Sequence, residues 1–426
     1  MKMKLKSIIF LLIVTSIFSS CDDKIMETYM ANVPVYITYG ELRNSVQTEA
    51  VRNLENPGKI YFYNDYLFIN EYLKGIHVID NSNPSSPQNI AFINVSGNVD
   101  ISVKDDILYA DSYIDLVALD ISNINNIVEV NRLKDIFQYI IPPYDNNYRV
   151  DDINYDKGVV VDWELKKITR EIEQHNYPIY PWSEGVDYME ASYSNGTSGY
   201  SSGASSFGVG GSMARFTIRN NVLYAIDSGE LKVVDITNHT DLLLISSLYV
   251  TWGIETLFPS GDHLFIGSQT GMLIYDITNP KYPLFISEYQ HITSCDPVVI
   301  EGDYAYVTLR AGNLCGEESN QLDVIDISDL ENPEWVESYP MTEPYGLGID
   351  NSTLFVCDGS AGLKIFDASE VDGIADNIIA TFPDIETYDV IPLNGILMLI
   401  GDDGLYQYDY SDLNDIQLLS SIAITN

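Results

Sequence analysis

The sequence predicts an all-β fold, a β-propeller of seven blades, and three observations support this prediction. A short phrase of alternating apolar residues that ends in Asp occurs seven times, and polar turn residues follow the copies. Five of the six intervals between successive closing aspartates lie between 40 and 50 residues. A period near 41, built from strand-like units, is typical of propellers, in which each copy forms one blade. The copies are Ile76–Asp80, Val117–Asp120, Leu231–Asp235, Met272–Asp276, Leu322–Asp326, Leu363–Asp367 and Leu405–Asp409.

Each repeat contains four short strands separated by turns. Within the second repeat the predicted strands are Val99–Val103, Ile107–Asp111, Leu116–Asp120 and Ile127–Leu133. Four such strands make one blade. We expect the Asp that ends the third strand to accept a hydrogen bond from a nearby backbone N–H group, a structural role rather than a catalytic one. The predicted blades are 57–97, 98–134, 213–252, 253–293, 294–342, 343–384 and 385–424.

One interval is much longer than the others and predicts an insertion. Asp120 and Asp235 are 115 residues apart, so one period of 40 leaves a surplus of 75. We place this surplus at 135–212, as a long inserted loop on one face of the propeller at 57–424. The alternative is an eighth blade, because Asp152–Leu165 reads like two strands although it lacks the Asp-turn ending. Its last part, Ser194–Ser212, is rich in Ser and Gly, a composition typical of flexible linkers.

Residues 1–20 have the features of an export signal. Three lysines precede the apolar run Ile8–Val14, which is too short to be a stable membrane span. Small residues then precede Cys21, a pattern that resembles a lipoprotein signal peptide and implies that Cys21 is lipidated. We therefore expect an outer-membrane lipoprotein of the cell envelope, facing the periplasm or the cell surface. Residues 21–56 are expected to form a tether, in which 33–39 adds an outer strand that helps to close the ring.

The chain is strongly acidic. It has 62 Asp and Glu residues against 22 Lys and Arg residues, which gives a formal net charge of −40. Nucleic-acid binding needs a basic surface, so this class of partner is excluded. Electrostatic attraction to anionic lipid headgroups is excluded for the same reason. A solvated acidic surface that keeps an exported protein soluble is the simpler interpretation, and a site for cations or amines is the alternative.

Three of the repeated phrases carry a resemblance to a known family. Gly75–Asp80 (GIHVID), Leu231–Ile236 (LKVVDI) and Leu322–Ser328 (LDVIDIS) resemble the LVIVD repeat. The resemblance covers roughly 57–134 and 213–424. It implies a β-propeller of a family that consists largely of secreted or lipid-anchored bacterial proteins. It implies no catalytic activity, and it leaves the insertion unexplained.

The cysteines and histidines give little sign of metal chemistry. Cys295 and Cys315 are expected on loops of one blade, and export permits a disulfide bond between them. Cys357 follows an apolar strand and is expected to be a small buried residue. The sequence has no CxxC pair and no HExxH motif, so we predict no metal site and no cofactor. Acidic turns such as 402–404 are an alternative place for Ca²⁺, but exposed turns have the same composition.

One group of charged residues is expected to converge on the channel. Alignment of the blades on their second strands places these residues at the start of the innermost strand of each blade, around one mouth of the channel. Charged side chains that converge on a concave channel mouth predict a ligand-binding site there. The aromatic rings of Trp252, Tyr345 and Tyr388 would let a ligand stack on them. In the alternative interpretation, the acids bond to backbone N–H groups of neighbouring blades and tie the ring together. The predicted mouth residues are Lys59, Asp100, Arg215, Glu255, Asp296 and Asp389.

These observations predict a lipid-anchored extracytoplasmic binding or scaffold module, and they favour a protein that is not an enzyme. Its ligand, an envelope protein or a glycan, would bind at the channel mouth. The first alternative is a carbohydrate-active hydrolase or lyase that uses Asp100, Glu255, Asp296 or Asp389, with carboxylates about 5–10 Å apart. The second is a purely structural role in an envelope complex.

Overall fold

The computed structural model describes residues 25–172, 208–290, 297–311 and 320–425. These fall into two compact units, and each is described by itself. The first contains most of residues 25–36 and 142–172, and the second contains the repeats. None of the helices in the described ranges is long and apolar enough to cross a membrane.

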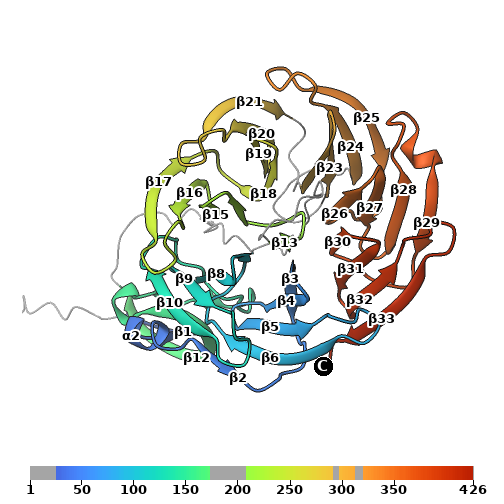
Figure 1. The fold of residues 1–426 in the computed structure, drawn as a ribbon. Helices are drawn as coiled ribbons and strands as arrows, with labels where there is room; N and C mark the ends of the chain where they lie inside the picture. The colour runs from blue at the N-terminus through green and yellow to red at the C-terminus, as the bar shows by residue number, and fades with distance from the viewer. Residues whose placement is uncertain (1–24, 173–207, 291–296, 312–319, 426) are drawn as a thin grey trace, which may run out of the picture. The chain divides into compact units, whose positions relative to one another are not determined.

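The second unit is a ring of antiparallel sheets (Figure 1). Within the described residues, seven sheets each contain a run of four strands that are consecutive in the sequence, and we call each run a blade, numbered in chain order. The fold is therefore an all-β propeller, as predicted.

The strands of blades 1 to 4 are β3 (Pro57–Tyr63), β4 (Tyr66–Glu71), β5 (Gly75–Asp80) and β6 (Gln88–Asn94); β7 (Ile101–Lys104), β8 (Ile107–Ser112), β9 (Asp115–Asp120) and β10 (Val128–Leu133); β14 (Phe216–Arg219), β15 (Val222–Asp227), β16 (Glu230–Asp235) and β17 (Leu243–Tyr249); and β18 (Ile254–Ser260), β19 (His263–Ser268), β20 (Gly271–Asp276) and β21 (Leu284–Gln290). Those of blades 5 to 7 are β22 (Val298–Glu301), β23 (Tyr304–Leu309), β24 (Gln321–Asp326) and β25 (Glu334–Pro340); β26 (Leu347–Asp350), β27 (Thr353–Cys357), β28 (Leu363–Asp367) and β29 (Ile378–Phe382); and β30 (Asp389–Leu393), β31 (Ile396–Gly401), β32 (Gly404–Asp409) and β33 (Gln417–Ala423).

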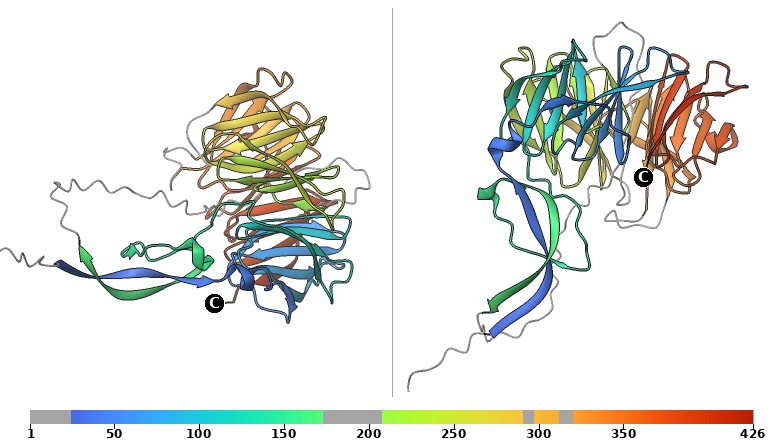
Figure 2. Two further views of the ribbon diagram at one scale, coloured as in Figure 1. Left: turned by 90° about the vertical axis from the view of Figure 1, so that its left-hand side faces the viewer. Right: turned by 90° about the horizontal axis from the view of Figure 1, so that it is seen from below.

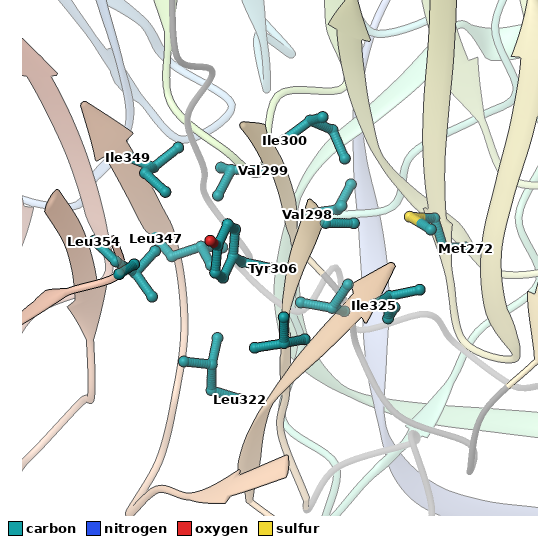
Figure 3. Close-up of a cluster of buried hydrophobic side chains, with 14 of the residues drawn as sticks. Met272, Val298, Val299, Ile300, Tyr306, Leu322, Ile325, Leu347, Ile349 and Leu354 are labelled. Carbon is teal, nitrogen blue, oxygen red and sulfur yellow. The ribbon is translucent and has the colours of Figure 1, made fainter. Parts of the chain in front are cut away.

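Buried apolar side chains fill the interfaces between neighbouring blades. One cluster joins blades 4, 5 and 6, where Tyr306 packs near Leu347 and Val298 (Figure 3). Similar clusters join the other neighbouring blades, including blades 7 and 1. Each blade therefore buries both faces of its sheet, which explains the near-continuous apolar runs of β4, β8 and their counterparts.

The Asp that closes the third strand has the same role in every repeat. Its Oδ1 accepts a hydrogen bond from the backbone N–H two residues later, over 2.7–3.0 Å. This bond closes the turn before the fourth strand, so the predicted structural role is confirmed. The pairs are Asp80–Ser82, Asp120–Ser122, Asp235–Thr237, Asp276–Thr278, Asp326–Ser328, Asp367–Ser369 and Asp409–Ser411.

The first unit contains a three-stranded sheet in the order β11–β1–β12. Its strands are β1 (Ile25–Ile37), β11 (Arg149–Val150) and β12 (Val159–Ile172), and β1 and β12 form a long ribbon (Figure 2). The side chain of Asn32 in β1 donates to the carbonyls of Asp145 and Tyr148 at 2.9 Å, which holds the β11 segment against β1.

The structure differs from two expectations for the regions outside the repeats. Of the strand expected at 33–39, residues 33–37 form the end of β1, which pairs with β11 and β12 and not with a blade. The outer edge of blade 1 is instead extended by β2 (Gln47–Glu49), after the short helix α2 (Tyr39–Leu42). Likewise, the insertion at 135–212 is not only a loop, because it supplies β11, β12 and β13 (Val209–Gly210). Sequence periodicity cannot show which distant strand a segment will pair with.

Candidate functional site

Five of the six predicted mouth residues lie around the central axis, at the start of inner strands. Lys59 is in β3, Glu255 is in β18 and Asp389 begins β30. Asp100 and Arg215 directly precede β7 and β14. Asp296 lies outside the described residues. We call this end of the ring the mouth side, and the end where the inner strands finish the far side.

The chain itself occupies the centre of the ring (Figure 1). Residues 208–214, which are the end of the insertion and the two residues after it and which we call the channel segment, cross the channel from the far side to the mouth side. At the far side, the N–H of Gly208 donates to the carbonyl of Val103 at 3.0 Å, and β13 pairs antiparallel with β3. At the mouth side, the carbonyl of Ala214 accepts from the N–H of Leu257 at 2.8 Å.

Lys59 and Asp100 form a buried ion pair that holds this segment. Their Nζ and Oδ2 atoms are 3.1 Å apart, and the Lys59 ammonium also donates to the carbonyl of Met213 at 2.7 Å. The same Oδ2 accepts from the backbone N–H groups of Arg215 and Phe216, the latter at 3.1 Å. Burial lowers the pKa of Lys59, and the Asp100 carboxylate opposes this shift. The pair thus fixes the point at which the chain leaves the channel and enters blade 3.

Asp389 lies against the middle of the channel segment. It is fully buried, and its Oδ2 has no hydrogen-bond partner in the structure. The atoms nearest to an added Cβ at Gly211 would be those of the Asp389 carboxylate, within overlap distance, so only glycine fits at this position. Burial raises the pKa of Asp389 to about 8, and the nearby Asp100 contributes to this shift. The Asp389 side chain is therefore mainly a neutral carboxylic acid at pH 7.

Arg215 and Glu255 are partly exposed residues, although Oε2 of Glu255 is buried. The Arg215 guanidinium donates to the carbonyl of Ile226 at 3.3 Å. Oε1 of Glu255 accepts from the Gln269 amide at 3.1 Å, while its Oε2 has no partner in the structure. Burial raises the pKa of Glu255, against the opposing effects of its hydrogen bond to Gln269 and the charges of Arg310 and Arg215.

Aromatic and acidic side chains continue from the axis on the side of blades 5 to 7. The Arg310 guanidinium lies 4.2 Å from the ring centroid of Tyr345, within the range of a cation–π interaction. The rings of Tyr345 and Tyr388 are 5.5 Å apart, and the Tyr345 hydroxyl donates to Glu343 at 3.1 Å. Trp252, which precedes β18, is 55% exposed. Of the residues predicted to offer stacking faces, Trp252 is exposed, whereas the ring of Tyr345 already contacts the Tyr388 ring and the Arg310 guanidinium.

A cavity of about 10 Å³ lies beside Arg215. Its lining includes Asp111, Asp227 and Phe137. Burial raises the pKa of Asp111 to about 6, although the carboxylate accepts hydrogen bonds from the N–H groups of Val99 and Asp100. The volume is enough for about one water molecule, far below the space that a small organic ligand needs. The pocket therefore offers no substrate site.

Several predicted features lie outside the described residues. These are the lipidation site Cys21 and both members of the expected disulfide, Cys295 and Cys315. Cys357 is a buried free cysteine. Among the described residues, no group of three or more His, Cys, Asp and Glu side chains is arranged to hold a metal ion.

Two parts of the site were not predicted from the sequence. The channel segment has the Ser/Gly-rich composition of a linker, and its residue pattern predicts no contact with the inner strands of the blades. Arg310 directly follows the second strand of blade 5, β23, and this position also reaches the mouth side. The signal that could have found Arg310 is the blade alignment itself, extended to the ends of the second strands.

The ring of four-stranded antiparallel blades defines the protein as a β-propeller. Its repeats match the model of the LVIVD repeat at residues 58–95, 210–250, 257–291 and 294–341. Four stretches of the chain thus match the LVIVD repeat, as the repeated phrases predict, and this repeat-based fold supports a binding or scaffold module.

The chain is also similar to solved structures at low sequence identity. One is the computationally designed protein Ika8, with 10% identity and a TM-score of 0.48 over 89% of this chain and 92% of that one. Another is Hsv2 of Kluyveromyces lactis, with 9% identity and a TM-score of 0.46 over 85% and 98% of the two chains. No curated protein matches the sequence.

Proposed function

We propose that this protein is a lipid-anchored, extracytoplasmic binding or scaffold module of the cell envelope, and that it binds an envelope protein or a glycan at the mouth side of the propeller. The Cys21 signal supports the anchor, and the acidic composition argues against a nucleic-acid partner. The proposal needs neither a cofactor nor a metal ion.

One observation carries the non-catalytic part of the proposal. The two carboxylates nearest the axis are buried within the chain: Asp100 accepts from two backbone N–H groups and from Lys59, and Asp389 lies against Gly211. A glycosidase needs two carboxyl groups that reach the substrate from opposite sides. Among the predicted acids in the described ranges, Glu255 is the one that is partly exposed as a residue, and its Oε2 is buried. This geometry supports binding rather than hydrolysis.

The binding surface we propose consists of Arg215, Glu255 and the exposed Trp252. Partly exposed Trp and Arg side chains are frequent anchors of protein interfaces. Arg215 could bind a carboxylate or a sulfate group of a glycan, and Trp252 could stack on a sugar ring or an apolar side chain.

A first prediction concerns the Trp252→Ala variant. Loss of an aromatic anchor should weaken binding by about fivefold or more, because such anchors commonly contribute over about 1 kcal/mol. The measurement is binding of the purified mature protein to a glycan array and to extracted envelope proteins of the same cells. Trp335→Ala is the matched control, since Trp335 is 56% exposed but lies on the outer strand β25. Equal losses in both variants would contradict a mouth-side surface. Turnover of a glycan that Glu255→Gln abolishes would favour the hydrolase or lyase instead.

A second prediction concerns the anchor. Cys21→Ser should move the protein from the membrane fraction to the soluble extracytoplasmic fraction and should abolish incorporation of labelled palmitate, because the acylated thiol is lost. A wild-type protein that is soluble and carries no label would contradict the anchor without affecting the binding proposal.

A further inference from the structure

We propose that the central channel is a binding site for an extended, glycine-containing chain segment, and that residues 208–214 occupy it as an internal ligand that locks the ring of blades. This inference is independent of the proposed function, because it concerns the interior of the ring and not its mouth-side surface.

The way in which the ring is closed supports this proposal. Among the described residues, every blade is made of four strands that are consecutive in the sequence, and no N-terminal strand completes blade 7. The interface between blades 7 and 1 therefore depends on side-chain packing and a few hydrogen bonds. One of these bonds joins the N–H of Thr425 to the carbonyl of Leu54 at 3.1 Å. A ring closed in this way would benefit from a second element that contacts several blades at once.

The channel segment is such an element. It adds to the inner edge of blade 1 as β13, and it bonds to Val103 of blade 2 through Gly208. Ser212 accepts at Oγ from the N–H of Leu347 in blade 6 at 3.0 Å. Its last residue, Ala214, accepts from Leu257 in blade 4, and Gly211 lies against Asp389 of blade 7. The segment thus contacts blades 1, 2, 4, 6 and 7.

The channel segment also fits closely against the residues around it. An added Cβ would overlap the ring of Tyr61 at Gly208 and the carboxylate of Asp389 at Gly211. The N–H of Gly211 donates to the carbonyl of Ile60 at 3.3 Å, which continues the pairing with β3. This is strand addition to the inner edge of blade 1, a recurring mode of peptide recognition, at positions that favour residues without a side chain.

The route of the chain before and after the channel also supports the proposal. The insertion leaves the propeller at the mouth side, where the N–H of Ile136 bonds to the carbonyl of Ile114 in the β8–β9 turn at 2.9 Å. It returns at the far side, where Gly208 meets Val103. Blade 3 begins only after the chain has crossed the whole channel. A loop that only connected blades 2 and 3 could run over the surface. The passage of the chain through the axis therefore indicates that residues 208–214 bind there.

Amide hydrogen exchange on the wild-type full chain is the first test. The amides of Gly208 and Gly211 should exchange at least ~10-fold more slowly than in a free synthetic peptide of residues 206–216, because both are hydrogen-bonded inside the ring. Slowing of less than ~10-fold would overturn the proposal.

A double-mutant cycle is the second test, since the Asp389 side chain supplies the three atoms nearest to an added Cβ at Gly211. Gly211→Ala should lower the midpoint of thermal unfolding and should speed exchange at the amide of Thr425, which bonds across the interface of blades 7 and 1. In the background of Asp389→Ala, the same Gly211→Ala change should cause a much smaller shift, because the obstructing carboxylate is gone. Equal shifts in the two backgrounds, or no effect on Thr425, would contradict a segment that locks the ring. If Gly211→Ala does not fold on its own, recovery of folding in the double variant is itself the expected result.

Discussion

Asp100 and Lys59 show how charged residues at a channel mouth can serve the fold. Both are buried, and together they bind the carbonyl of Met213 and the N–H groups of Arg215 and Phe216. Removing one member of a buried pair leaves the other charge without compensation, which commonly costs about 3–5 kcal/mol. Replacing either residue would therefore test the stability of the ring before it tested any ligand.

Asp389 gives a prediction for pH. Its pKa is raised from 3.8 to about 8 in the folded protein, so the folded state keeps a proton that the unfolded state loses. The free energy of unfolding should therefore decrease as pH rises from about 4 to about 8, by up to about 1.4 kcal/mol per pH unit from this residue. Asp389→Asn removes this contribution and should be more stable than the wild type at pH 8, but not at pH 4.

Urea unfolding of both proteins at intervals between pH 4 and pH 8 measures this difference. Other buried acids such as Asp111 also titrate in this window, so the difference between the two proteins is the informative quantity. A difference that does not change with pH would show that Asp389 is ionised in the folded state.

The sequence predicted where these residues lie, and for Asp100 the alternative interpretation also predicted the kind of partner, because its carboxylate accepts from the backbone N–H groups of Arg215 and Phe216 in the neighbouring blade. Their position on the axis follows from the period of the repeat, because equivalent residues of equivalent strands share one place in the ring. Other contacts of Lys59 and Asp389 are to Met213 and Gly211, in the Gly-rich stretch 208–214. No local pattern can show that such a stretch will lie inside the ring, because that position results from tertiary packing.

At the scale of the element, a β-bulge recurs in the fourth strand of every blade. The register between the third and fourth strands shifts by one residue at the same place each time, and the extra residue is always aliphatic. The bulged residues are Ile90, Val130, Ile245, Ile286, Val336, Ile379 and Leu419. A bulge increases the local twist of a strand. The alternation of the sequence predicted these strands but not the extra residue, since an apolar pair such as Trp335-Val336 fits several registers.

Val336 and Trp335 give the prediction for this element. Val336 packs against the buried cluster of blades 4 to 6, whereas its neighbour Trp335 is 56% exposed. Val336→Ala removes two methyl groups and should lower the free energy of unfolding by about 1–1.5 kcal/mol. Trp335→Ala, although a much larger truncation, should change it by about 0.5 kcal/mol or less. Denaturant unfolding measures both, and the reverse order would show that the bulged residue does not face the core.

At the scale of the whole molecule, the sequence predicted a closed ring because seven similar units, each too small to bury its own apolar face, must cover one another. It could not predict how blade 7 meets blade 1, because that interface joins residues more than 300 positions apart. In the structure, an apolar cluster and a pair of side-chain amides join blade 7 to blade 1. Asn81 donates to Oε1 of Gln407 at 2.9 Å, and Gln407 donates to Oδ1 of Asn81 at 2.7 Å.

This amide pair gives the prediction for ring closure. Both side chains are buried, so Gln407→Ala leaves the Asn81 amide without its partner and should cost about 1–3 kcal/mol. Gln417→Ala, on the exposed outer strand β33 of the same blade, is the control and should cost about 0.5 kcal/mol or less. In the double variant Asn81→Ala/Gln407→Ala the loss should be smaller than the sum of the two single losses, because each single change already breaks the shared pair. Strictly additive losses, measured by urea unfolding, would mean that the two amides act independently and that closure rests on the apolar cluster and the channel segment.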